Sequence, residues 1–329
     1  MLRNVLVLCS KNVYRVVFIC CIIFLFLLAI TIKNTDVTKD EISLTSKLAE
    51  YIETAPNIVH YVIFNRTNFD FIVFLSVTSV LKVQRPSEIL IHSDSTNGFS
   101  GYYWNIVSEL SQKLEIPIRV VFLPRPTHVF GQRLSSVYHS TDVARIQVLM
   151  SFGGIYIDTD VLILQPLDEF LKYEMTLGWP PNENIGTQVL IAKKNARFLE
   201  LWLDGYRKYK ARSWYYNAGQ YPTQQILAKD KDIAHTVPKL FGVHNLLDKL
   251  YGTADWEDWK TYYTLHLLSR HPPAPLELNE TTILNYTSPF GEISRWILFD
   301  LVPKVRIASA KEFFKSSTTW KSILPSDNV

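Results

Sequence analysis

The stretch FGGIYIDTDVLILQPLD, from Phe152 to Asp168, carries the strongest signal for fold and chemistry in this 329-residue chain. Its apolar run predicts a buried strand, and Asp158 and Asp160 interrupt that run two residues apart. On an extended strand, residues at this spacing project to the same face, so both carboxylates should point to one place. Because burying unpaired carboxylates is costly, we expect them to hold a ligand.

The paired carboxylates indicate a metal site. Hard oxygen ligands suit Mg²⁺ or Mn²⁺, which proteins commonly hold with one or two carboxylates while substrate phosphates complete the shell. The pair therefore predicts a phosphorylated ligand bound through a metal ion. Gly153 and Gly154, just before the strand, would allow a sharp turn or a close approach of the backbone.

Strands and helices alternate on both sides of this motif. Apolar runs indicate strands at 58–64, 88–94, 118–124 and 187–194, whereas 101–115 and 195–210 have the pattern of helices. This alternation predicts an α/β fold with a mostly parallel sheet flanked by helices. Ligands bind outside the carboxyl ends of such strands, where Asp94 and Asp158 fall.

A helix is also expected just before the motif, over STDVARIQVLMSF, with Ser140 or Thr141 as its cap. Asp142 and Arg145 are three residues apart and share a face of this helix. By themselves they fit an ordinary surface ion pair, which contributes little to stability.

Residues 16–32, VVFICCIIFLFLLAITI, hold no charge and reach the lower limit for a helix that spans a bilayer. Arg3, Lys11 and Arg15 precede the run, so the positive-inside rule keeps the N-terminus cytosolic. A cleaved signal peptide is the alternative, but its small-x-small cleavage site is poorly formed here. We expect a cytosolic tail (1–15), a transmembrane signal anchor (16–32), a polar stem (33–55) and a lumenal domain (56–329).

Charge and cysteine content further limit which classes of protein fit the sequence. The chain has 34 basic and 31 acidic side chains and no clustered basic excess, which excludes an obvious nucleic-acid surface. The cysteines (Cys9, Cys20 and Cys21) all precede the stem, so the expected lumenal domain forms no internal disulfide. Asn-x-Thr triplets make Asn65, Asn279 and Asn285 glycosylation acceptors if that domain is lumenal.

The segments around the motif resemble a known family. STDVAR (140–145), FGGIYIDTD (152–160) and LQPL (164–167) together resemble the Asp-x-Asp sugar-binding region of glycosyltransferase family 32, the group of the α-1,4-galactosyltransferases and α-1,4-N-acetylglucosaminyltransferases. PNIVHYVIF (56–64), WYYNAGQYPTQQIL (214–227) and TLHLLSRH (264–271) resemble family segments more weakly.

The resemblance implies a GT-A-type, Rossmann-like fold, a nucleotide-sugar donor, a divalent metal and transfer with retention of configuration. It implies that Asp160 ligates the metal that bridges the donor diphosphate, while Asp158 contacts the ribose or sugar and supports the metal. Asp142 and Arg145 match an Asp-x-x-Arg that holds the donor sugar in related enzymes. Donor binding extends in this assignment to Tyr156 and Gly154.

GT-A enzymes often take a third metal ligand from a later segment, and His266 is the candidate here, with His271 behind it. Charge on the leaving diphosphate needs cations, for which the candidates are Arg145 and then Arg125 or Arg133. His60, in the first expected strand, fits a packed or hydrogen-bonded core residue better than a base contact.

Aromatic residues supply the candidates for acceptor binding. Trp214, next to two tyrosines in an expected loop, is favoured for stacking on a sugar, while Trp202 fits the core of a helix. Trp256 and Trp259 are further stacking candidates. Asn217 could reach a sugar, but within Asn-Ala-Gly it is equally a turn residue.

These expectations combine into a metal-dependent hexosyltransferase that is anchored in the Golgi membrane as a type II protein. It would use Mn²⁺ or Mg²⁺ and a UDP-sugar, with galactose or N-acetylglucosamine as the sugar, to extend a glycolipid or glycoprotein glycan in α-linkage. One alternative is a non-catalytic, membrane-anchored glycan binder. The other is a haloacid-dehalogenase-like phosphatase, although in that fold the Asp-x-Asp motif normally opens the domain.

Overall fold

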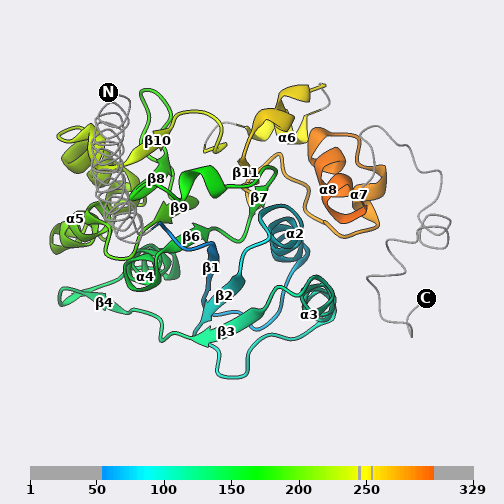
Figure 1. The fold of residues 1–329 in the computed structure, drawn as a ribbon, viewed down its shortest axis with the longest axis horizontal. Helices are drawn as coiled ribbons and strands as arrows, with labels where there is room; N and C mark the ends of the chain where they lie inside the picture. The colour runs from blue at the N-terminus through cyan, green and yellow to red at the C-terminus, as the bar shows by residue number, and fades with distance from the viewer. Residues whose placement is uncertain (1–53, 244–245, 253–254, 300–329) are drawn as a thin grey trace, which may run out of the picture. The chain divides into compact units, whose positions relative to one another are not determined.

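A seven-stranded sheet runs through the computed structural model, which describes residues 54–243, 246–252 and 255–299 (Figure 1). Its strand order is β10 (His235–Val237), β8 (Met175–Gly178), β9 (Val189–Ala192), β6 (Gly154–Ile157), β1 (Ile58–Ile63), β2 (Glu88–Ser93), β3 (Ile118–Phe122). β9 runs antiparallel to both of its neighbours, whereas the other neighbouring strands pair in parallel. The prediction of a mostly parallel sheet is therefore confirmed, with one reversed strand.

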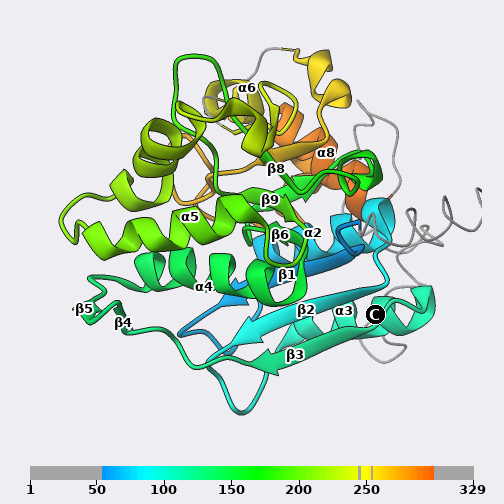
Figure 2. The same ribbon diagram turned by 60° about the vertical axis from the view of Figure 1, so that its left-hand side comes forward.

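Helices cover both faces of this sheet (Figures 1 and 2). On one face lie α2 (Phe71–Ser79) and α3 (Tyr102–Leu114), with α8 (Pro289–Phe299) packed on α2. The other face is covered by α4 (Val137–Phe152) and α5 (Arg197–Gly205). The shorter strands and α-helices are β4 (His128–Val129), β5 (Gln132–Arg133), β7 (Val161–Ile163), β11 (Thr264–His266), α6 (Leu247–Tyr251) and α7 (Thr282–Asn285), and short 3-10 and π-helical segments lie between the elements.

The inner strands are buried on both faces, because successive apolar side chains along them point to opposite sides of the sheet. On β1, Tyr61 and Ile63 belong to the core under α2 and α3, while Val62 and the adjoining Phe64 belong to the core under α4. Each face of the sheet thus packs against its own hydrophobic core, and polar side chains lie beyond the strand ends. This arrangement positions the site described below.

Two histidines lie buried side by side in the centre of the sheet. The Nε2 of His60 donates to the Gly153 carbonyl at 2.8 Å, so its Nδ1 accepts from the Nε2 of His92 at 3.1 Å. The expectation that His60 is a hydrogen-bonded core residue is confirmed. Burial lowers the pKa of His60 to about 3, helped by His92, and lowers the pKa of His92 to about 4.

The histidine pair predicts a loss of stability in acid. Above the ordinary pKa of about 6.5, both imidazoles are neutral whether the chain is folded or unfolded. Below that pH, the two imidazoles bind protons in the unfolded chain, whereas in the folded chain they stay neutral down to about pH 4. The free energy of unfolding should therefore fall by up to about 1.4 kcal/mol per pH unit for each histidine. Urea titrations at pH 7.5 and 5 measure this.

A matched pair of variants tests the assignment. His92→Gln removes one of the two depressed imidazoles and should lower the pH dependence of stability, whereas His128→Gln, at an exposed position, should leave it unchanged. An equal pH dependence in the wild type and in His92→Gln would contradict the prediction.

Two local expectations were wrong. The helix before the motif begins at Val137 and is capped by Ser136, whose side chain accepts from the His139 N–H. Ser140 and Thr141 lie inside it: the Ser140 hydroxyl donates to the Pro126 carbonyl at 2.7 Å, and the Thr141 hydroxyl donates to the Val137 carbonyl one turn back at 3.0 Å. The Asn-Ala-Gly signal lies in a short π-helical segment, 216–220, instead of a turn.

The expected tail, anchor and most of the stem lie outside the described residues. Within the described ranges, no helix combines the length and apolar character that a membrane span requires.

Candidate active site

The two motif carboxylates come together through a turn. β6 ends at Ile157, and the N–H of Val161 donates to the Asp158 carbonyl at 3.1 Å, so 158–161 reverses before β7 begins. The prediction that a continuous strand brings the two side chains together on one face was therefore wrong, because a turn follows Ile157. The convergence itself is present, since oxygens of Asp158 and Asp160 lie within 4.8 Å of each other and of a His266 nitrogen.

His266 reaches this turn because β11 pairs antiparallel with β7, with His266 opposite Val161. Its Nε2 lies 3.3 Å from Oδ1 of Asp160. The Leu267 N–H donates to the Asp160 carbonyl at 2.8 Å, which fixes the two strands in this register. The pairing of β11 with β7 thus places His266, the predicted third metal ligand, beside Asp160.

These three residues fit a divalent cation in chemistry and in spacing. Ligand atoms about 2.1 Å from one ion lie up to roughly 4.2 Å apart, which small side-chain rotations would satisfy here. Burial raises the pKa of Asp160, but the opposing effect of His266 and Arg270 is larger, so the pKa lies below its ordinary value. Burial lowers the pKa of His266, but Asp160 raises it more.

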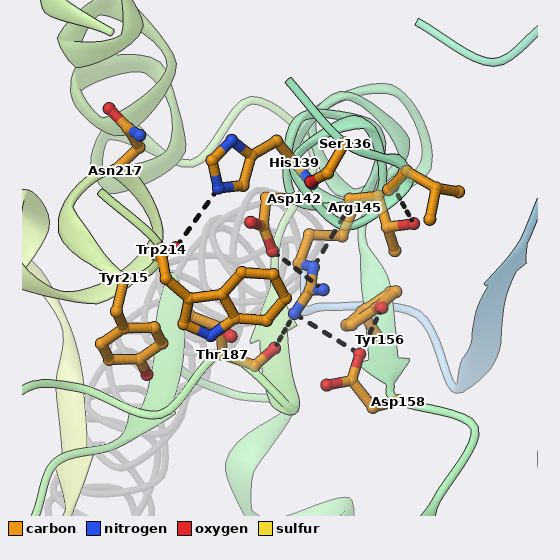
Figure 3. Close-up of polar contacts among 12 residues, drawn as sticks. Ser136, His139, Asp142, Arg145, Tyr156, Asp158, Thr187, Trp214, Tyr215 and Asn217 are labelled. Carbon is orange, nitrogen blue, oxygen red and sulfur yellow. Dashed lines mark hydrogen bonds and ion pairs between the residues drawn. The ribbon is translucent and has the colours of Figure 1, made fainter. Parts of the chain in front are cut away.

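Arg145 joins the motif to α4 (Figure 3). Its Nη2 lies 3.0 Å from Oδ1 of Asp142, and its Nη1 lies 3.4 Å from Oδ1 of Asp158 and donates to the Thr187 carbonyl at 2.8 Å. Tyr156 supports the same group: its hydroxyl donates to Asp158 at 2.6 Å, and its ring centroid lies 4.7 Å from the Arg145 Cζ. Four of the predicted donor-binding residues, Asp142, Arg145, Tyr156 and Asp158, therefore form one connected cluster, which does not include Gly154.

The Asp142–Arg145 pair is not an ordinary surface pair. Asp142 is 8% exposed and Arg145 is 6% exposed. Burial raises the pKa of Asp142, while Arg145 opposes this rise. An ion pair at this depth needs full compensation by neighbours, and Asp158, Thr187 and Asp142 provide it for the guanidinium.

A cavity of about 570 Å³ connects these groups and is large enough for a nucleotide-sized ligand. One part of its wall is the chain that follows β1, including Phe64, Asn65 and Arg66. The metal-ligand candidates and the Arg145 cluster form another part. His271 also lines the cavity.

A third part of the wall is aromatic and cationic. Trp214 is 63% exposed and packs edge-on against Tyr138, with ring centroids 5.0 Å apart. His139 holds the loop in place, with Nε2 3.3 Å from the Trp214 carbonyl oxygen. Arg270 donates to the Tyr138 hydroxyl and lies over its ring. Sequence reasoning missed Tyr138 and Arg270, although Arg270 lies in the quoted segment TLHLLSRH, four residues after His266.

Several sequence candidates lie elsewhere. Gly154 approaches β1 so closely that an added Cβ would meet the Ile58 carbonyl at 2.7 Å, which explains the glycine. The Asn217 side chain bonds the Lys210 backbone. Trp202 is buried in the core, as expected. The cavity lining does not include Gly154, Asn217, Trp202, Trp256, Trp259, Arg125 or Arg133.

The three glycosylation candidates differ in setting. Asn65 is exposed and lines the cavity, and its N–H donates to Asp94 at 2.9 Å. The Asn279 side chain accepts from the Thr281 N–H at 2.9 Å. Asn285 is exposed at the end of α7. A glycan at Asn65 would stand at the wall of the cavity, unlike one at Asn285.

Comparisons with known proteins agree with this site. Residues 99–177 match the family model of the glycosyltransferase sugar-binding region containing a DXD motif. Glucan organizing enzyme 1 of Cryptococcus neoformans is 22% identical over 241 residues, which cover 66% of this chain and 63% of that protein. Human lactosylceramide 4-alpha-galactosyltransferase is 24% identical over 215 residues, with 60% of each chain covered.

A solved structure of the glycosyltransferase GlyE of Streptococcus pneumoniae TIGR4 is similar at a TM-score of 0.46 and 12% identity, covering 83% of this chain and 66% of that one. The chain spans somewhat under two thirds of the curated relatives named above. The matched region contains Asp142, Arg145, Asp158 and Asp160. The predicted resemblance is confirmed: residues 99–177 carry the glycosyltransferase sugar-binding region that contains the DXD motif.

Proposed function

We propose that this chain is a metal-dependent glycosyltransferase that transfers galactose or N-acetylglucosamine from a UDP-sugar, with retention, to a glycolipid or glycoprotein glycan. The observation that supports it best is the convergence of Asp158, Asp160 and His266 in one cavity with the buried Arg145 cluster. A nucleotide sugar presents a diphosphate and a hydroxylated ring, and the two groups of residues match these two halves.

Each part of the wall has a role in this proposal. Asp160 and His266, with Asp158, would hold Mn²⁺ or Mg²⁺, which when bound stabilises negative charge on the leaving diphosphate. Arg270, which lines the cavity and lowers the pKa of Asp160, adds positive charge on this side. The Asp142–Arg145 pair offers hydrogen-bonding groups to the hydroxyls of the donor sugar.

Acceptor binding is assigned to the exposed aromatic residues. Trp214 and Tyr138 offer apolar ring faces at the cavity, and such faces pack against the C–H surface of a sugar. We assign 16–32 to a signal anchor that tethers the domain in the Golgi membrane, which would raise its effective concentration on membrane-borne acceptors. Asp158 already binds Tyr156 and Arg145, a setting that does not favour the phosphatase alternative.

The test is release of UDP from a panel of UDP-sugars by the full-length protein in detergent, with Mn²⁺ and then with a chelator. We expect release from one donor, its loss on chelation and its recovery when Mn²⁺ is restored. A glycan acceptor should accelerate release, and Trp214→Ala should weaken that acceleration while slow hydrolysis of the donor persists. Absence of release from every donor, with or without acceptors, would reject the proposal.

A further inference from the structure

Gln188 is a cavity residue that the roles above leave unassigned. It precedes β9, is 3% exposed and lines the cavity, and its amide Nε2 is buried without a hydrogen-bond partner. Among the described residues, other buried side-chain atoms lack partners too, but none of those residues lines the cavity. Leaving a buried donor unpaired costs stability, so its presence requires an explanation.

The backbone of Gln188 is fixed between the two functional groups of the site. Its carbonyl accepts from the Asp158 N–H at 2.9 Å, at the end of the β6–β9 pairing. The preceding carbonyl, that of Thr187, accepts from Arg145. The Gln188 side chain therefore starts from a point held by both the metal-site turn and the Arg145 cluster.

A glycine makes room for the amide. A Cβ at Gly186 would lie 2.5 Å from Oε1 and 2.9 Å from Nε2 of Gln188, so the carboxamide packs directly on the Gly186 backbone. Its terminal torsion is soft, as for any glutamine, so the amide can rotate in place to present its N–H groups to a different partner. The pocket is thus shaped for an amide at this position.

Gln84 shows what a structural glutamine at the same depth looks like. It is also 3% exposed, but its Nε2 donates to Asn57 at 2.9 Å and its Oε1 accepts from the Leu167 N–H at 2.7 Å. Gln84 lies outside the cavity lining. Its hydrogen bonds are completed by the protein, whereas those of Gln188 are not.

We propose that Gln188 is a donor-sugar-binding residue whose amide N–H groups donate to an oxygen of the bound hexose. This inference rests on the proposed function and assigns the ligand group at one point of that site. The acidic diphosphate already has the metal and Arg270 as partners, while a neutral amide donor suits a hydroxyl or ring oxygen. The contact would orient the sugar between the metal-site turn and Arg145.

The test compares Gln188→Met with Gln84→Met in the full-length protein. Methionine keeps the length of the side chain and removes the amide. Three quantities are measured: the melting temperature, the dissociation constant for UDP with Mn²⁺, and kcat/KM for UDP release from the preferred UDP-sugar. For Gln188→Met we expect an unchanged or higher melting temperature, UDP affinity within twofold of wild type, and kcat/KM lower by about tenfold or more. For Gln84→Met we expect a lower melting temperature and wild-type kinetic constants.

Three results would overturn the inference. The first is wild-type kcat/KM in Gln188→Met, and the second is a loss of UDP affinity as large as the loss of kcat/KM, which would place the contact on the nucleotide. The third is a fall in melting temperature with unchanged kinetics, the pattern of a structural glutamine. If the wild type uses no UDP-sugar, the proposed function fails and this inference with it, so the two failures are distinguishable.

Discussion

Asp160→Asn is expected to lower metal-dependent UDP release by roughly a thousandfold, since a metal ion contributes several kcal/mol of charge stabilisation. Asparagine keeps the shape of the side chain but removes the negative charge. Asp160 is the carboxylate next to His266, with Nε2 and Oδ1 3.3 Å apart, so this change weakens both the charge and the geometry of the expected metal site. Initial rates with Mn²⁺ across a concentration series measure the effect.

The matched control is Asp204→Asn. Asp204 is exposed, pairs with Arg207 on the surface and does not line the cavity, so the rate should stay at the wild-type level. Far-ultraviolet circular dichroism on both variants separates loss of metal binding from loss of fold. A wild-type rate in Asp160→Asn that remains sensitive to a chelator would show that the metal binds elsewhere.

Arg145→Met is expected to have the largest effect on stability, a loss of about 3–5 kcal/mol in the free energy of unfolding. The guanidinium lies between the buried Asp142 and the Asp158 carboxylate, and its Nη1 also satisfies the Thr187 carbonyl. Without it, Asp142 loses the neighbour that opposes the rise of its pKa, so it should take up a proton or remain as an uncompensated charge. Urea unfolding at pH 7.5 measures the loss.

Arg145→Lys separates charge from geometry. Lysine keeps a positive charge but lacks the planar fork that reaches two carboxylates and a carbonyl, so it should recover part of the stability and little of the activity. Arg197→Met removes an exposed arginine that pairs with Glu174, and we expect little change in stability from it. An equally small loss in Arg145→Met would mean that the buried cluster is not compensated as described.

The elements that sequence predicted well are those with local signals. β1, β2 and β3 lie where apolar runs predicted strands, and α3 lies where a helical pattern predicted a helix, because each element must bury its own apolar face. The start of α4 was predicted wrongly from Ser140 and Thr141, because serine and threonine can either cap a helix or donate to a carbonyl from inside it. The true cap, Ser136, has an extended backbone, and its side chain accepts from the His139 N–H.

Long-range pairing decided what the local pattern could not. β9 was predicted as a strand, but its reversed direction depends on where the chain returns after β8. Asn217 looked like a turn or sugar-binding residue, yet its amide is taken up by the Lys210 backbone. The carboxylates of Asp158 and Asp160 meet through a turn that ends β6, not through the pleat of a strand.

The sequence by itself determined the α/β class, the pair of carboxylates at a strand end and the resemblance that assigns them to a sugar-binding region. Only the tertiary structure decided that Asp142 and Arg145 are buried, that His266 meets Asp160, and that Gln188 lies in the cavity with its amide unpaired. The reason is physical: periodicity and spacing report which face of an element is apolar, whereas burial and hydrogen-bond satisfaction depend on which distant segments cover that face.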